Sequence, residues 1–114
     1  MTVEHRLATY GSLAPGKLNN NQLDGLAGFW RSGKIFGRLV DAGWGSDLGF
    51  PGLVLDDQAY AIPVSVFESS DLPHHWQRLD SFEGEGYRRA PVSVTIDGEQ
   101  VEAHVYTLAK IARL

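Results

Sequence analysis

The stretch DLPHHWQRLDSFEG, residues 71–84, predicts a short helix, the one clear helix in the sequence. Asp71 is a suitable N-cap, because its side chain can accept a hydrogen bond from an amide of the first turn. Pro73 is tolerated at the start of a helix, and Gly84 is suited to end one. Apolar residues recur between these ends at helical spacing, so we expect the segment to pack one face against the rest of the protein.

Glu83 falls on the apolar stripe of this helix. With about 3.6 residues per turn, Leu72, Trp76 and Leu79 share the stripe, and Glu83 follows Leu79 by four residues. Burial disfavours an ionised carboxylate, and so does the negative end of the helix macrodipole. Both effects raise the pKa of a glutamate, which predicts a general base near neutral pH. Because helix ends shift by a residue or two, a solvent-exposed Glu83 is the alternative.

Six short strands are predicted around the helix, at residues 7–10, 34–40, 53–55, 59–68, 89–96 and 101–108. Asp97-Gly98 between the last two is a strong hairpin signal, and Pro63 indicates a strand edge or a bulge. Residues 23–30 predict a short amphipathic turn or helix, and residues 41–52 a glycine-rich loop that packs through its aromatic side chains. This pattern predicts the α+β class: a small, closed or nearly closed β-barrel with one helix packed on it.

The composition limits the class of protein. The chain has 114 residues, 43% of them hydrophobic, which suits a single domain, residues 1–114, with one core. The net charge of −4 argues against a nucleic-acid partner, and the absence of cysteine excludes disulfides and thiolate metal sites. No signal peptide or apolar run of membrane-spanning length is found, so we expect a cytoplasmic protein without a membrane partner. The sequence does not indicate an oligomeric state.

Tyr10-Gly11-Ser12-Leu13 follows the first predicted strand and is a candidate anion-binding turn. A Gly-Ser turn can aim consecutive backbone N–H groups into one concavity, and Gly11 lets a ligand approach the backbone closely. A plain strand-ending turn is the alternative. Ser12 is not expected to be a hydrolase nucleophile, because no G-x-S-x-G elbow surrounds it.

Three further groups of residues carry weaker signals. His74 and His75 are adjacent in the predicted helix, so their side chains diverge and are not expected to chelate a metal. Arg88 and Arg89 point to opposite faces of a strand, where one could bind a substrate carboxylate or both could be surface residues. Tyr87 follows a short glycine-flanked turn, which can bring its hydroxyl back toward the cavity at the helix end.

The sequence contains three separated segments in this order: YGSL (10–13), GFPGLVL (49–55), and LDSFEG (79–84) followed by YRR (87–89). Together they resemble the γ-glutamylcyclotransferase-like family, which includes AIG2-like proteins and γ-glutamylamine cyclotransferases. The resemblance runs over about residues 7–108. It implies a small mixed β-barrel, a loop formed by Tyr10, Gly11, Ser12 and Leu13 that grips a γ-glutamyl group through backbone amides, and Glu83 as the acid/base.

The activity implied by this resemblance is intramolecular. Glu83 takes a proton from the α-ammonium of a γ-glutamyl substrate, and the freed amine attacks the γ-carbonyl to give 5-oxoproline and a free amine or amino acid. Tyr87 is expected to line the same cavity. No cofactor or metal is expected, because the nucleophile is tethered to its electrophile. Two alternatives stay open: a module that binds a γ-glutamyl or carboxylate metabolite or a protein without turnover, and a scaffold domain whose cavity is inactive.

Overall fold

The computed structural model of the chain describes residues 2–11, 13–17, 19–40, 52–56 and 58–108. Ser12 and the loop residues 41–51, which include Trp44 and Phe50, lie outside this described part. The described elements are η1 (Val3–His5), β1 (Arg6–Thr9), η2 (Asn20–Leu23), β2 (Phe29–Val40), β3 (Gly52–Leu55), β4 (Tyr60–Glu68), η4 (Leu72–His74), α1 (Trp76–Glu83), β5 (Tyr87–Ile96) and β6 (Glu99–Leu108).

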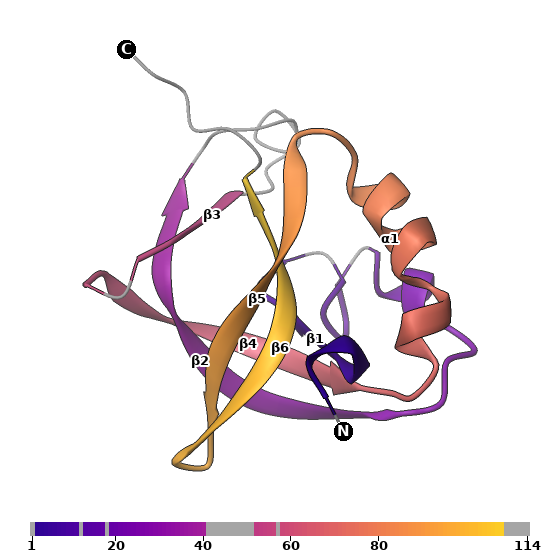
Figure 1. Cartoon of the computed structure of the whole chain (residues 1–114), viewed down its shortest axis with the longest axis horizontal. Helices are drawn as coiled ribbons and strands as arrows, with labels where there is room; N and C mark the ends of the chain where they lie inside the picture. The colour runs from indigo at the N-terminus through magenta and orange to yellow at the C-terminus, as the bar shows by residue number, and fades with distance from the viewer. Residues whose placement is uncertain (1, 12, 18, 41–51, 57, 109–114) are drawn as a thin grey trace.

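The strands close into a barrel. Neighbouring strands are hydrogen-bonded in the order β3-β2-β4-β1-β6-β5, and β2 also pairs with β5. The circle therefore contains β2, β4, β1, β6 and β5, while β3 lies outside it and extends the sheet from β2. Strands β1 and β6 are parallel, and the other pairs are antiparallel. Figure 1 shows α1 packed beside this barrel. The predicted α+β barrel of about six strands with one helix is confirmed.

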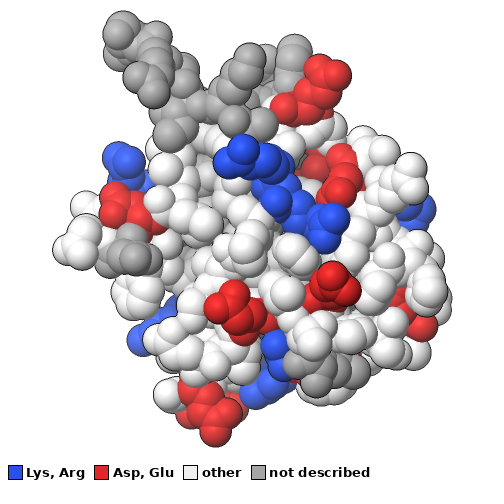
Figure 2. Space-filling model, viewed as in Figure 1, with Lys and Arg blue, Asp and Glu red and all other residues white. Residues whose placement is uncertain are grey.

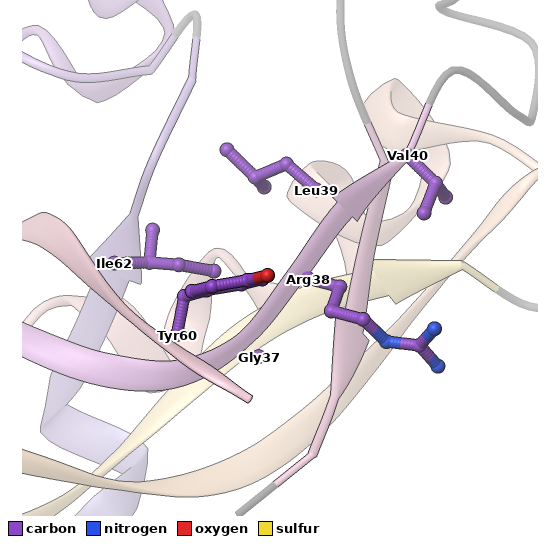
Figure 3. A pocket seen from close by; sticks show the side chains of 6 residues that line it. All are labelled: Gly37, Arg38, Leu39, Val40, Tyr60 and Ile62. Atoms are coloured by element: carbon purple, nitrogen blue, oxygen red, sulfur yellow. The ribbon is translucent and has the colours of Figure 1, made fainter. Parts of the chain in front are cut away.

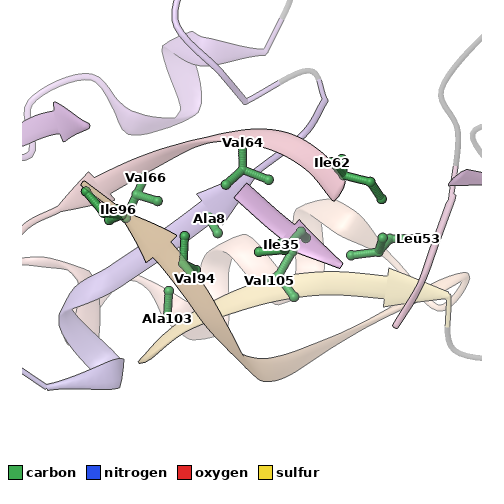
Figure 4. Close-up of a cluster of buried hydrophobic side chains, with 10 residues drawn as sticks. All are labelled: Ala8, Ile35, Leu53, Ile62, Val64, Val66, Val94, Ile96, Ala103 and Val105. Atoms are coloured by element: carbon green, nitrogen blue, oxygen red, sulfur yellow. The ribbon is translucent and has the colours of Figure 1, made fainter. Parts of the chain in front are cut away.

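The side chains form two buried clusters, because alternate residues of a strand face opposite sides of the sheet. Ala8 of β1 and Val105 of β6 face the barrel interior, whereas Leu7 and Tyr106 face α1. Figure 4 shows the interior cluster, which consists of Ala8, Ile35, Leu53, Ile62, Val64, Val66, Val94, Ile96, Ala103 and Val105. The cluster under the helix consists of Leu7, Leu13, Leu23, Phe67, Leu72, Trp76, Leu79 and Tyr106. The helix is thus fixed to the barrel by its own core.

The β5–β6 hairpin follows the predicted turn. Asp97 has a φ of 51° and Gly98 a φ of 82°, the left-handed values that a two-residue hairpin turn requires at both central positions. Pairing continues from Ile96↔Glu99 to Tyr87↔Leu108. The turn therefore sets the register along the whole hairpin and brings Tyr87 to the end of the barrel where α1 stops.

Two local predictions are wrong, and both were overridden by long-range contacts. Residues 23–30 do not form one turn or helix: η2 ends at Leu23, and Trp30 lies in β2, where its ring packs against Phe67 at 5.0 Å between centroids. Asp71 holds the predicted N-cap position, at the start of η4, but makes no capping hydrogen bond, because its carboxylate instead accepts one from the Ala27 amide at 2.8 Å.

Pro63 fits its strand without a bulge. Strand β4 pairs with β2 from Tyr60 to Glu68 but with β1 only from Ser65 to Glu68. Pro63 therefore lies beyond the end of β1, and on that side β4 has no partner strand. The missing N–H of proline interrupts no strand pairing on that side.

Candidate functional site

The helix predicted over residues 71–84 is divided into η4, which contains Leu72, and α1, which begins at Trp76, and the two together carry the predicted apolar stripe. Leu72 and Leu79 are fully buried and Trp76 is 6% exposed. The Trp76 indole also donates a hydrogen bond of 2.9 Å to the Glu4 carbonyl, which ties the start of the helix to the N-terminal segment. Gly84 ends the helix with a φ of 83°, a conformation that favours glycine. The stripe therefore continues directly to Glu83, the last residue of α1.

Glu83 is half-buried, and burial raises its pKa from an ordinary 4.5 to about 7. The cause is the loss of hydration of the ionised form, the effect expected from its place on the apolar stripe. A carboxylate with this pKa is partly ionised at neutral pH and can both take up and return a proton.

Two tyrosines from separate parts of the chain lie near Glu83. Tyr10 follows β1 and Tyr87 begins β5. The pKa of the Tyr10 hydroxyl is raised, first by burial and then by the charges of Tyr87 and Glu83, which places the three side chains in one neighbourhood. The helix end, the end of β1 and the start of β5 thus bring together residues that are far apart in the sequence.

The Tyr10 hydroxyl makes a hydrogen bond within the protein. It donates a hydrogen bond of 2.7 Å to the main-chain carbonyl of Tyr106. Tyr10 therefore links the end of β1 to β6.

A charged network that the sequence did not predict lies one turn before Glu83. The Asp80 carboxylate accepts hydrogen bonds from Arg89 at 2.9 and 3.2 Å and from the Tyr106 hydroxyl at 2.7 Å. The Arg89 guanidinium also lies over the Trp76 ring, 4.4 Å from its centroid. Arg89 is thus occupied within the protein. The four residues extend from Trp76 to Tyr106, so no local pattern could have grouped them.

The turn after Tyr10 is only partly described. The Gly11 amide donates a hydrogen bond of 3.3 Å to the Thr9 hydroxyl, and the Gly11 carbonyl accepts one from the Ala14 amide. Among the described residues, a Cβ atom added at Gly11 would meet nothing within 4 Å beyond its chain neighbours, so one side of this backbone is open to them. Leu13 is 3% exposed and its side chain belongs to the cluster under the helix. Ser12 lies outside the described residues.

Two other candidates from the sequence are at the surface. His74 is exposed, and Arg88 is exposed on the opposite face of β5 from Arg89. No group of three or more His, Cys, Asp or Glu side chains in the described part of the chain could hold a metal ion. Among the same residues, no helix has the length and hydropathy to cross a membrane. Figure 2 shows acidic and basic side chains interspersed on one face.

A shallow groove of about 350 Å³ lies elsewhere, over the end of β2 and the start of β4. Its lining consists of Gly37, Arg38, Leu39, Val40, Tyr60 and Ile62. Figure 3 shows Leu39, Tyr60 and Ile62 around the groove, with the Arg38 guanidinium extending away from Leu39. None of the residues around Glu83 contributes to this lining.

A comparison with protein families finds one match over nearly the whole chain. The family is described as gamma-glutamyl cyclotransferase, AIG2-like, and its model matches residues 7–113. A comparison with curated proteins finds no significant match.

Solved structures share the fold. YkqA from Bacillus subtilis is 27% identical with a TM-score of 0.71, and the match covers 92% of this chain but 36% of that protein. An AIG2-like protein from Mus musculus is 25% identical with a TM-score of 0.68, over 95% of this chain and 79% of the mouse protein. An uncharacterized protein from Pyrococcus horikoshii is 24% identical with a TM-score of 0.66, over 95% and 80% of the two chains.

Proposed function

Because this chain belongs to the gamma-glutamyl cyclotransferase, AIG2-like family, we propose that it converts a γ-glutamyl amine or γ-glutamyl amino acid into 5-oxoproline and a free amine or amino acid. The observation that carries this proposal is the half-buried carboxyl group of Glu83, whose pKa is raised to about 7. It lies beside Tyr10 and Tyr87 at the end of the barrel.

In the proposed reaction, the ionised Glu83 takes one proton from the α-ammonium of the substrate. The neutral amine then attacks the γ-carbonyl carbon, which closes the five-membered ring. The bond from this carbon to the leaving nitrogen breaks as the protonated Glu83 gives its proton to that nitrogen. The ionised Glu83 then takes the second proton from the ring nitrogen, which leaves the neutral lactam, and returns it to the released amine, which departs as an ammonium ion. The proton count balances over the cycle. A base with a pKa near 7 suits these transfers, because it neither holds nor releases the proton too strongly.

The turn from Tyr10 to Leu13 supplies the proposed binding groups, with backbone amides of Gly11 and Ser12 directed to the substrate. The 3.3 Å bond from the Gly11 amide to the Thr9 hydroxyl is long for a hydrogen bond. A substrate carboxylate or a developing oxyanion would make a shorter, charge-assisted bond to the same amide. Open space at Gly11 would allow that approach. Tyr87 is the residue we propose on the other side of the substrate.

No cofactor is needed in this scheme. The amine and the γ-carbonyl belong to one molecule, so the enzyme has only to hold the folded substrate and move a proton. The driving contributions are orientation, proton transfer and stabilisation of the carbonyl oxygen.

The direct test is incubation of the purified protein with a panel of γ-glutamyl amines and dipeptides, followed by detection of 5-oxoproline. Glu83→Gln should lower turnover by at least about a hundredfold, the low end for loss of a general base. Glu85→Gln is the matched control, because Glu85 is an exposed carboxylate two residues away, and it should retain wild-type turnover.

A protein that binds these compounds but releases no 5-oxoproline would be a binding module instead. Full activity in a folded Glu83→Gln variant would move the base to another residue.

A further inference from the structure

We propose that Asp80, held by Arg89 and Tyr106, is a positioning residue that fixes the carboxyl group of Glu83 for proton transfer. The inference rests on the proposed cyclotransferase reaction, in which Glu83 is the base. It assigns a role to a network that touches no substrate.

Both carboxylate oxygens of Asp80 are engaged by the barrel. Arg89 Nε donates to Oδ1 at 2.9 Å, and Arg89 Nη2 donates to Oδ2 at 3.2 Å. The Tyr106 hydroxyl adds a third bond to Oδ1 at 2.7 Å. The two-pronged geometry of a guanidinium on a carboxylate restrains direction as well as distance. Asp80 is therefore joined to β5 and β6 at once.

The arginine in this network is itself restrained. Its guanidinium lies 4.4 Å from the centroid of the Trp76 ring, in the geometry of a cation–π contact. The His104 ring packs against Trp76 in an edge-on arrangement, with centroids 5.1 Å apart. Arg89 thus contacts both Trp76 and Asp80 on α1, which fixes the rotation of the helix against β5.

The hydrogen bonds of Asp80 are the last described side-chain contacts that join α1 to the barrel before Glu83. Asp80 precedes Glu83 by three residues, and the side chains between them, Ser81 and Phe82, are exposed. The Asp80 carbonyl accepts the Gly84 amide at 3.1 Å, which closes the final turn. The same residue therefore anchors this turn through its side chain and ends it through its main chain.

Tyr106 connects the anchor to the other side of the site. Its hydroxyl binds Asp80, while its carbonyl accepts the hydroxyl of Tyr10. The charge of Glu83 is among the causes that raise the pKa of both tyrosines. Glu83 therefore lies near Tyr10 and Tyr106. Both of these hydroxyls donate their protons to acceptors other than Glu83.

Arg89→Lys is the main test, because it keeps the charge of the network and removes the two-pronged hydrogen bonding. We expect kcat to fall by roughly tenfold or more, since small displacements of reacting groups cost that much. We expect KM to stay within about twofold, because the variant should weaken stabilisation of the transition state and leave substrate binding largely intact. The pKa of Glu83, read from its side-chain carbon by NMR, should move from about 7 toward 4.5 as the last helical turn becomes more hydrated.

Arg31→Lys is the matched control. Arg31 makes a similar bond to Glu68, with Nη1 and Oε1 3.0 Å apart, and Glu68 pairs with the start of β1, at the opposite end of this strand from Tyr10. This variant should lose stability without changing kcat or the pKa of Glu83. If Arg89→Lys does not fold, Tyr106→Phe removes a single hydrogen bond to Asp80, leaves the charges in place and is measured in the same way.

The outcomes separate this inference from the proposed function. Unchanged kcat and an unchanged pKa of Glu83 in a destabilised Arg89→Lys protein would overturn the positioning role. If the wild-type protein forms no 5-oxoproline, the proposed function fails, and the NMR measurement still decides whether the network controls the environment of Glu83.

Discussion

The Tyr10 hydroxyl and the Tyr106 carbonyl are joined by a hydrogen bond of 2.7 Å that links the end of β1 to β6. Strands β1 and β6 are the parallel pair of the barrel, with a register given by Leu7↔His104. The hydrogen bond follows this pair along the chain, just after the end of β1. It holds β1 and β6 together near Glu83. Tyr10 is therefore part of the structural frame of the site as well as the first residue of the proposed binding turn.

Tyr10→Phe should lower the free energy of unfolding by about 1–2 kcal/mol, because the Tyr106 carbonyl loses its donor in a partly buried place. The ring remains, so the apolar contacts should persist. Urea unfolding measures the change. Tyr60→Phe is the control, since the Tyr60 side chain is 77% exposed and its hydroxyl should contribute nothing measurable. Equal stability of the two variants would mean that the hydrogen bond from Tyr10 to Tyr106 does not stabilise the fold.

Gly11→Val should raise KM strongly and leave the melting temperature nearly unchanged. A Cβ atom at this position meets no other described residue within 4 Å, so we expect the free protein to accept the larger residue, while a ligand that needs the same space cannot bind. Ser12→Ala should change KM little if Ser12 acts through its amide. A wild-type KM in Gly11→Val would place the substrate elsewhere.

The sequence predicted the parts of this fold that depend on neighbouring residues. The Asp97-Gly98 turn carries its own left-handed backbone preference, and the stripe that ends at Glu83 follows from helical spacing alone. Both patterns act within a few residues. That is why the hairpin turn and the half-buried carboxylate could be predicted without any tertiary contact.

The missed features all depend on contacts between distant segments. Trp30 joins β2 because the strand pairs with β4 and the ring meets Phe67. The Asp71 side chain accepts a hydrogen bond from the Ala27 amide and not from an amide of its own first turn. The partners of Asp80 come from β5 and β6 and become neighbours only after the hairpin packs under α1. Aspartate in the middle of a short helix gave no local signal for such a role.

The raised pKa of Glu83 predicts a specific effect of pH on stability. The folded protein holds this proton more tightly than the unfolded chain, so the contribution of Glu83 is most favourable below an ordinary pKa of 4.5. Stability is lost as pH rises from there through about 7. Glutamine does not ionise, so the Glu83→Gln variant does not show this loss. The stability of the variant relative to wild type should therefore increase over the same pH interval and then level off.

Urea unfolding at a series of pH values tests that prediction. Glu85→Gln serves as the control, because an exposed carboxylate should give a nearly constant difference. A Glu83→Gln curve parallel to that of wild type would mean that the Glu83 carboxylate is well hydrated in the folded protein.

The activity should rise with pH along a limb with an apparent pKa of about 7 in kcat/KM, because only the ionised Glu83 can accept the substrate proton. The hydroxyls of Tyr10 and Tyr106 are not expected to contribute to this limb, since burial moves the pKa of each above its ordinary value. The substrate ammonium titrates at higher pH and adds a second limb, so the profile is compared with an NMR titration of the Glu83 side-chain carbon in the ligand-free protein. Agreement of the two values assigns the limb to Glu83. An NMR value near 4.5 would instead describe a hydrated carboxylate, and the activity would then depend on another group.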